Sequence, residues 1–165
     1  MKVRVLIILK PDCLEKGVET EVKKTLVAAG WPIVAEKRIE KVSTDLLEAH
    51  YNDVGKLRER LTEAKGAEFA NAVIVSTFDY MTRGPIEALV IEREVKNLEE
   101  AEEAISYLRS DVVGATRPWQ AKSGTIREMH GNKDPEHEPI ENVVHCSGCF
   151  AEGDLEWRLW FPELA

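Results

Sequence analysis

Four short segments carry the side chains that could perform chemistry. One of them, Asn142-Val143-Val144-His145-Cys146-Ser147, ends a short apolar run with a histidine beside a predicted loop. A neutral imidazole is a good nucleophile near pH 7 and can form a covalent intermediate. A lone histidine is also common as a structural residue, so His145 alone does not separate a catalytic role from a structural one.

A carboxylate follows this histidine further along the chain. Glu156, in the segment Asp154-Leu155-Glu156-Trp157, could accept a hydrogen bond from one ring nitrogen of His145. Such a bond fixes the tautomer and leaves the other nitrogen free to attack. Nothing in the spacing shows that Glu156 reaches His145, and a solvated acidic helix face is the alternative.

Two further segments carry cations suited to phosphate. Lys10 opens Lys10-Pro11-Asp12 at the end of a predicted strand, where an ammonium group can reach a bound phosphate. Arg127 ends Gly124-Thr125-Ile126-Arg127, and Thr116 precedes this run. An arginine can fork onto phosphate oxygens, and a hydroxyl can add one more bond. Each of these residues could equally be a solvated surface group.

The cysteines suggest two other kinds of chemistry. Cys146 and Cys149 have the C-x-x-C spacing, and the total of three cysteines argues against a closed disulfide framework. A structural zinc site needs about four ligands, and no second C-x-x-C pair is present. A redox C-x-x-C usually follows a strand and opens a helix, which is compatible with this position. Zinc and redox chemistry therefore stay open as alternatives.

The composition limits the class of protein. The chain has 165 residues, of which 44% are apolar and 32% charged, as in an ordinary globular domain. The apolar run Val5 to Leu9 is too short for a membrane span or a secretory signal, so we expect a cytoplasmic protein without membrane contact. The net charge of -8 argues against binding of the nucleic-acid backbone over a large surface but allows a local basic pocket.

The elements that must position these residues follow from the hydrophobic pattern. Their order is typical of a ferredoxin-like βαββαβ α+β sandwich, in which helices cover a four-stranded antiparallel sheet. We see no linker and expect one domain over residues 1–165. The pattern predicts strands at 3–9, 33–42, 86–91 and 142–146, helices at 18–29, 43–50, 55–83, 98–108 and 155–161, and a long loop or lid at 114–141.

Several motifs together resemble those of a known family. The segments VLIILKPDCLEKG, EAHY, TRGPIEALVIE, VVGATRP, SGTIR, NVVHCS and LWFPE occur in the order and approximate spacing of nucleoside diphosphate kinases. The resemblance covers nearly the whole chain. N-x-x-H-x-S in combination with KPD and GTIR is specific, although each motif alone would be weak.

The resemblance implies both a fold and an activity. The family has the ferredoxin-like fold and transfers the γ-phosphate of a nucleoside triphosphate to a nucleoside diphosphate through a phosphohistidine, with Mg²⁺ bound with the nucleotide. It also implies a homo-oligomer. By resemblance, His145 is the nucleophile, Ser147 and Glu156 are its partners and Tyr51 lies nearby, while Lys10, Arg127 and Asn142 contact phosphates and sugar and Thr116 binds a phosphate oxygen.

The chain also departs from the family pattern. Gly148 stands where the family has an acid, and Arg109 lies one position away from the family's phosphate-binding arginine. The segment 52–83 is longer than usual, and Phe69 within it is our candidate for stacking on the base. The segment 127–142 is also longer and replaces an apolar stretch that helps subunits associate, which puts the usual hexamer in doubt. A catalytically weakened nucleotide-binding or regulatory module is therefore the alternative function.

Overall fold

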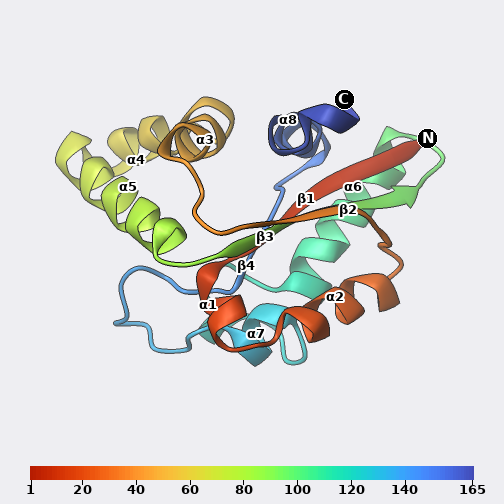
Figure 1. Ribbon diagram of the computed structural model, residues 1–165, viewed down its shortest axis with the longest axis horizontal. Helices are drawn as coiled ribbons and strands as arrows, with labels where there is room; N and C mark the ends of the chain where they lie inside the picture. The colour runs from red at the N-terminus through yellow and green to blue at the C-terminus, as the bar shows by residue number, and fades with distance from the viewer.

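The computed structural model describes residues 1–165 and contains a four-stranded antiparallel sheet (Figure 1). The strand order is β2-β3-β1-β4, so β1 lies inside the sheet and β4 at one edge. β1 pairs with β3 along its whole length and with β4 over three residues. This arrangement confirms the predicted ferredoxin-like α+β fold. The strands are β1 (Lys2–Leu9), β2 (Ile33–Ile39), β3 (Ile86–Glu94) and β4 (Val144–Cys146).

Helices cover both faces of this sheet, which is why β1 is an almost unbroken apolar run. Val5 and Ile7 face one core, whereas Leu6 and Ile8 face the other. In Figure 1, α3, α5 and α8 lie above the sheet and α2 and α7 below it, while α6 crosses the strands in this view and buries Ala101 and Ile105 in the same core as α2. No helix is long and apolar enough to cross a membrane. The α-helices are α1 (Pro11–Glu15), α2 (Glu19–Ala28), α3 (Thr44–Glu48), α4 (Leu57–Lys65), α5 (Ala67–Thr82), α6 (Leu98–Tyr107), α7 (Ile126–His130) and α8 (Phe150–Trp160).

Several predicted boundaries are wrong for local reasons. The short helix α1 follows β1 although no helix is predicted there. Pro11 takes its first helical position, where the missing N–H costs nothing. The helical stretch 55–83 divides into α4 and α5 at Gly66, whose φ is +89°. The last helix begins at Phe150 rather than at 155. The loop 114–141 contains α7 and the short 3₁₀ turn η3 (Pro118–Gln120).

The last strand also differs from its prediction. The pattern predicts strand over 142–146, but β4 contains only Val144–Cys146. Val143 has φ of +62°, a left-handed conformation that is rare for a β-branched residue. The strict alternation of side chains expected from Asn142 onward therefore begins only at Val144.

Two helices end in a wider turn, and both turns carry residues of interest. α3 continues into η1 (Ala49–Val54), and α6 continues into η2 (Leu108–Val113). In η1 the N–H of Gly55 donates to the carbonyl of His50, and in η2 that of Gly114 donates to Arg109. These bonds span five residues instead of four. Turns of this π type are frequent at functional sites.

Candidate active site

His145 lies at the edge of the sheet. β4 pairs it with Ile8 of β1, and its side chain keeps 17% of its surface exposed. Val144 and Cys146 belong to the core below the sheet, together with Ile7. Because neighbouring strand residues point to opposite faces, His145 points to the other side, toward α8. Cys146 and His145 therefore face opposite sides of the sheet.

Glu156 holds this histidine from α8. His145 Nε2 lies 2.9 Å from Glu156 Oε2, and the hydroxyl of Ser147 donates to the same oxygen at 2.5 Å. Glu156 is only 1% exposed. Burial alone would raise the pKa of Glu156, but the charge and hydrogen bonds of His145, with His50 and Ser147, outweigh burial and lower it. The carboxylate therefore stays ionised, holds the Nε2 proton and leaves Nδ1 of His145 unpaired.

A second histidine, which the sequence reasoning missed, lies beside the first. His50 is 2% exposed, and its ring meets that of His145 edge to face with 4.6 Å between centroids. Trp160 Nε1 donates to His50 Nδ1 at 3.2 Å. Burial, followed by His145, lowers the pKa of His50 to about 3. Tyr51, expected near the catalytic histidine, contacts His50 at 4.7 Å between centroids.

Lys10 and Asn142 form a polar bridge between two segments distant in sequence. Lys10 Nζ donates to Asn142 Oδ1 at 2.8 Å, and Asn142 Nδ2 donates to the carbonyl of Thr116 at 2.9 Å. Burial lowers the pKa of Lys10 to about 7, and the charge of Arg127 acts in the same direction. Lys10, Asn142 and Thr116, all predicted to contact phosphate or sugar, therefore belong to one hydrogen-bond network.

The turn before the nucleophilic strand is held by Asp12, a residue to which the sequence reasoning assigned no role. Val144 N–H donates to the carbonyl of Asn142 at 2.8 Å, which makes Val143 the centre of a γ-turn with positive φ. Val143 N–H donates to Asp12 Oδ2 at 3.1 Å, and Lys10 N–H donates to the Val143 carbonyl at 2.8 Å. The hydroxyl of Tyr80 donates to the other oxygen of Asp12. The segment after β1 thus fixes the backbone next to His145.

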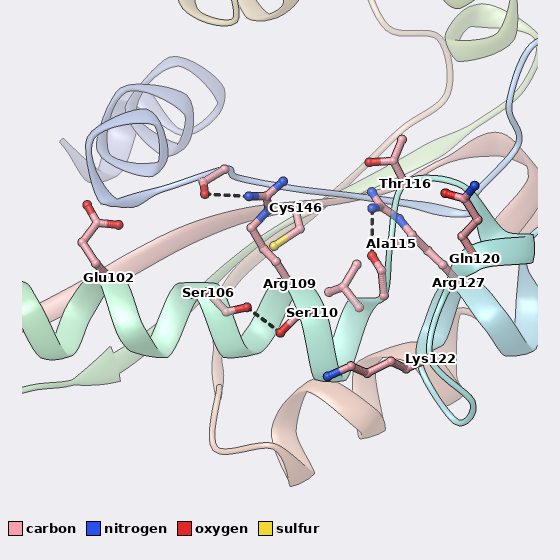
Figure 2. Close-up of a pocket in the computed structure, with 13 residues that line it drawn as sticks. Glu102, Ser106, Arg109, Ser110, Ala115, Thr116, Gln120, Lys122, Arg127 and Cys146 are labelled. Carbon is pink, nitrogen blue, oxygen red and sulfur yellow. Dashed lines mark hydrogen bonds between the residues drawn. The ribbon is translucent and has the colours of Figure 1, made fainter.

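A pocket of about 480 Å³ lies on the other side of β4 (Figure 2). Arg109, Thr116, Arg127 and Cys146 are among its lining residues, and the two arginines enter from two sides. Lys10, Asn142 and His145 do not line it. Arg127 connects the two regions, because its guanidinium donates to the carbonyl of Val144, directly before His145, at 2.8 Å.

The two arginines are held differently. Arg127 is buried and donates to the carbonyls of Gly114 and Val144, but its Nε has no partner. Burial lowers the pKa of Arg127 to about 10, so it stays charged at neutral pH. Arg109 is exposed, and one of its nitrogens donates to the Gly148 carbonyl at 3.0 Å. The pocket therefore holds two guanidinium groups with donors left for an anion.

The wide turn η2 explains how Arg109 reaches the pocket. Arg109 lies one position away from where the family's phosphate-binding arginine is expected. The turn of η2 takes up one additional residue, since Gly114 N–H bonds the carbonyl of Arg109 itself at 2.9 Å. The arginine that is displaced in sequence is thus brought to the pocket beside Thr116.

Phe69 is the predicted site residue that the structure does not bring to this region. It lies in the first turn of α5, is 39% exposed and has Lys65 Nζ 4.8 Å from its ring centroid. It does not line the pocket. In Figure 1 the long segment 52–83 extends away from the sheet as the α4–α5 hairpin, and α5 begins at its outer end.

Neither the possible metal ligands nor the C-x-x-C thiols form the site that their residue types suggested. The ligand atoms of His50, His145 and Glu156 lie within 4.8 Å of one another. Trp160 already bonds His50, and the carboxylate bonds His145, so this cluster does not form a closed four-ligand zinc site. Cys146 and Cys149 are free thiols, and burial raises the pKa of Cys146 to about 12. A thiol held protonated in this way is a poor nucleophile.

Taken together, fold and site define a ferredoxin-like α+β protein with a carboxylate-bound histidine next to a cationic pocket. The family model described as "Nucleoside diphosphate kinase" matches residues 3–165. The chain belongs to the nucleoside diphosphate kinase family and is a phosphotransferase.

Individual relatives agree with this assignment. A nucleoside diphosphate kinase of Caldanaerobacter subterraneus is 33% identical over 159 residues, which are 96% of this chain and 94% of that protein. One from Clostridium perfringens is 30% identical, over 96% of this chain and 91% of that protein. The crystal structure of an NDP kinase from Pyrobaculum aerophilum has a TM-score of 0.75 and 28% identity, over 98% of this chain and 96% of that one. The enzyme of Borrelia burgdorferi, solved as a transition-state mimic with vanadate and ADP, has a TM-score of 0.77 and 26% identity, over 97% and 87%.

Proposed function

We propose that this protein transfers the γ-phosphate of a nucleoside triphosphate to a nucleoside diphosphate by a ping-pong mechanism through phosphorylated His145. The observation that carries the proposal is the pairing of His145 Nε2 with buried Glu156 at 2.9 Å. This pairing fixes the proton on Nε2 and leaves the lone pair of Nδ1 free to attack.

In the first half-reaction, the Nδ1 lone pair of His145 attacks the γ-phosphorus. The bond from phosphorus to the bridging oxygen breaks, and the nucleoside diphosphate leaves with that electron pair. The proton on Nε2 remains there, and the carboxylate of Glu156 stabilises the positive charge that the ring acquires. In the second half-reaction, a terminal phosphate oxygen of the acceptor diphosphate attacks the phosphohistidine, and the lone pair returns to Nδ1.

The cationic and polar side chains would bind the phosphate groups and stabilise the negative charge of the phosphate being transferred. Phosphoryl transfer needs mainly positioning and electrostatic stabilisation. The unpartnered Nε of buried Arg127 and the free donors of Arg109 are suited to phosphate oxygens. Lys10 and Asn142 would contact sugar and phosphate, and Thr116 would add a hydroxyl. The Borrelia relative was solved with vanadate and ADP bound, which supports nucleotide-dependent phosphoryl transfer as the activity.

Magnesium fits this site as a companion of the nucleotide. The buried carboxylates nearest the network are Glu156 and Asp12, and hydrogen bonds within the protein occupy both. The remaining groups are amide, hydroxyl and cationic side chains, so the phosphate oxygens would be its main ligands. When bound, the ion would supply positive charge that offsets the charge of the phosphates. No carboxylate of the chain is assigned to it.

The test is direct labelling of the protein. Incubation with nucleoside triphosphate labelled at the γ-phosphate should yield label that is labile in acid and stable in base, and nucleoside diphosphate should remove it. His145→Ala should remove both labelling and turnover while the protein stays folded. The control is His130→Ala, in α7 and outside the site, which should label like the wild type.

A second candidate function has specific support. Gly148 replaces an acid and Arg109 is displaced, which favours a weakened kinase that binds nucleotide as a regulatory module. That function predicts nucleotide binding without label on His145. Label on the wild-type protein that nucleoside diphosphate discharges would exclude it.

A further inference from the structure

Helix α8 presents two polar side chains to two histidines. Glu156 and Trp160 are one helical turn apart, so they lie on the same side of α8. Glu156 accepts from His145, and Trp160 donates to His50. His50, Glu156 and Trp160 are each 2% exposed or less. The proposed mechanism uses Glu156 and His145 but assigns nothing to the other two.

The bond from Trp160 determines where His50 carries its proton. An indole N–H can only donate a hydrogen bond. Nδ1 of His50, 3.2 Å away, must therefore offer a lone pair. A neutral imidazole with its lone pair on Nδ1 carries its hydrogen on Nε2, so Trp160 selects one tautomer and opposes protonation of Nδ1.

This choice matters because the same nitrogen faces the catalytic carboxylate. His50 Nδ1 lies 3.6 Å from Glu156 Oε1, just beyond hydrogen-bond distance, while Oε2 is used by His145 and Ser147. A proton on Nδ1 would turn this approach into an attractive contact and draw the carboxylate toward His50. It would also place a second cationic ring beside His145, whose centroid is 4.6 Å away.

We propose that Trp160 and His50 form a positioning pair for His145. Trp160 keeps His50 neutral with its proton on Nε2, so His145 is the only imidazole that bonds the Glu156 carboxylate, and the edge-to-face contact of the two rings fixes the plane of the His145 imidazole. This inference rests on the proposed function of His145 as the nucleophile. It makes His50 and Trp160 positioning residues, since neither is placed against the transferred phosphate.

The surroundings of His50 agree with this role. Burial is the main cause that lowers the pKa of His50 to about 3, and His145 and Lys10 act in the same direction. The negative charge of Glu156 opposes them, and Tyr51 packs edge-on against the ring. Removal of the indole donor leaves this attraction to Glu156 in place and frees Nδ1 to receive a proton, so the pKa of His50 should rise.

The first measurement is ¹⁵N NMR of the histidine side chains, which reads the tautomer without reference to activity. In the wild type, His50 should remain neutral with hydrogen on Nε2 from mildly acidic to neutral pH. In Trp160→Phe, which keeps an aromatic ring and removes the donor, Nδ1 of His50 should take up a proton as the pH falls. A wild-type His50 with hydrogen on Nδ1 would overturn the proposal.

The second measurement is the pH profile of kcat/KM. Trp160→Phe should show an acid limb at higher pH than the wild type, falling about tenfold per pH unit below the new pKa. Adding His50→Asn should remove that limb, because an asparagine keeps an acceptor and does not titrate. Trp157→Phe on the same helix, whose ring faces Arg4 and Arg158, is the matched control and should keep the wild-type profile.

The two measurements separate the possible failures. An unchanged acid limb in Trp160→Phe, with a folded protein, contradicts the positioning role even if His145 is phosphorylated. If His145 takes no label at all, the proposed function fails, whatever tautomer His50 has. A purely structural role of Trp160 would lower activity equally at every pH and would not be reversed by His50→Asn.

Discussion

At the scale of single residues, Lys10 is a buried amine whose pKa lies near neutral pH. Its amino group faces Asn142 Oδ1 at 2.8 Å, and burial lowers its pKa to about 7. Without nucleotide, Lys10 is therefore charged below about pH 7 and increasingly neutral above it. A bound phosphate favours the charged form and raises this pKa again.

We therefore predict that nucleotide binding takes up a proton at Lys10. Above pH 7, binding should absorb up to about one proton, and affinity should decrease as the pH rises. Well below this pH, Lys10 is already protonated, so no uptake is expected. Calorimetry in buffers with different ionisation heats measures the uptake, and Lys10→Arg, which stays charged, should abolish it. Equal uptake in the wild type and Lys10→Arg would assign the proton to another group.

How far single residues could be predicted depended on their chemistry. Lys10, Arg127, His145 and Glu156 were predicted because their motifs resemble a family and their types suit phosphate transfer, and the structure brings them into connected networks. His50 was missed because its role comes from burial and from contacts with residues distant in sequence. No spacing in a sequence reports such contacts.

At the scale of elements, the junction of β1 and α1 controls the turn that precedes β4. Val143 has φ of +62°. Such a backbone conformation costs about 1–3 kcal/mol and persists only where surrounding contacts hold it. Asp12 accepts from Val143 N–H and from Tyr80, and Lys10 N–H bonds the Val143 carbonyl. The backbone of His145 is thus set by contacts from the other end of the chain.

We predict that Asp12→Asn impairs the phosphorylation of His145. An amide keeps only one acceptor oxygen. If that oxygen accepts from Val143 N–H, the amide NH₂ faces Tyr80 and the hydroxyl proton of Tyr80 loses its acceptor; if it accepts from Tyr80, Val143 N–H is left without a partner. Either loss costs about 1–3 kcal/mol. Single-turnover phosphorylation should slow by about tenfold or more if most of this loss reaches the transition state. Tyr80→Phe removes only the other donor to Asp12 and should slow the step less.

A second substitution tests whether this effect acts through the turn. Glycine adopts positive φ at little cost, so Val143→Gly should restore much of the rate in the Asp12→Asn background. Stability should still fall, because the buried Val143 side chain is lost. A rate that stays low in the double variant would mean that Asp12 acts by another route, such as its charge near Lys10.

The turn η2 leads to a prediction about which arginine binds the nucleotide. It places Arg109 in the pocket, where the guanidinium has donors left for phosphate. Arg109→Ala should therefore raise KM for nucleotides by about tenfold, the value of roughly one charged hydrogen bond. Arg117→Ala, next to Thr116 but not lining the pocket, is the control and should change KM little. A larger rise in KM for Arg117→Ala than for Arg109→Ala would show that Arg117, and not Arg109, contacts the nucleotide.

Elements were predictable in kind but not in their boundaries. The apolar runs of β1 and β3 identified both strands, because helices cover the sheet on both sides. The start of β4 could not be predicted, since Val143 has high strand propensity and is held out of the strand by contacts with Asp12 and Lys10, which are distant in sequence. The extra residue within η2 likewise leaves no signal in hydrophobic spacing.

At the scale of the whole molecule, a cationic site belongs to an acidic protein. The net charge is -8, yet Arg109 and Arg127 face one pocket and Lys10 lies in the adjoining network. A nucleotide, itself an anion, is repelled at long range and attracted at short range. The assembly into a homo-oligomer stays a prediction, and the long α4–α5 hairpin changes the surface available for it.

Salt should weaken the long-range repulsion by the acidic surface more than the short-range attraction by the pocket arginines. This difference gives a prediction for kcat/KM. The Debye length is about 10 Å at 0.1 M salt, so moderate salt screens the distant negative charges, while contacts to buried Arg127 are screened less. We expect kcat/KM to rise at first with added KCl and to fall at higher salt, where anions compete for the pocket. Steady-state rates over a KCl series at constant Mg²⁺ measure both limbs.

A variant with fewer acidic residues tests whether the rise of kcat/KM with salt comes from screening of the distant negative charges or from a general effect of salt on the enzyme. Glu99 and Glu103 are exposed on α6 and do not line the pocket, so changing both to Gln weakens the distant repulsion and leaves the site intact. The rising limb should become shallower and the rate at the lowest salt should increase, whereas the falling limb should not move. Since the falling limb reports competition for Arg109 and Arg127, it should shift only when the pocket itself is altered. A rate that falls from the lowest salt onward in both proteins would mean that the local cations outweigh the acidic surface at every distance from which a nucleotide approaches.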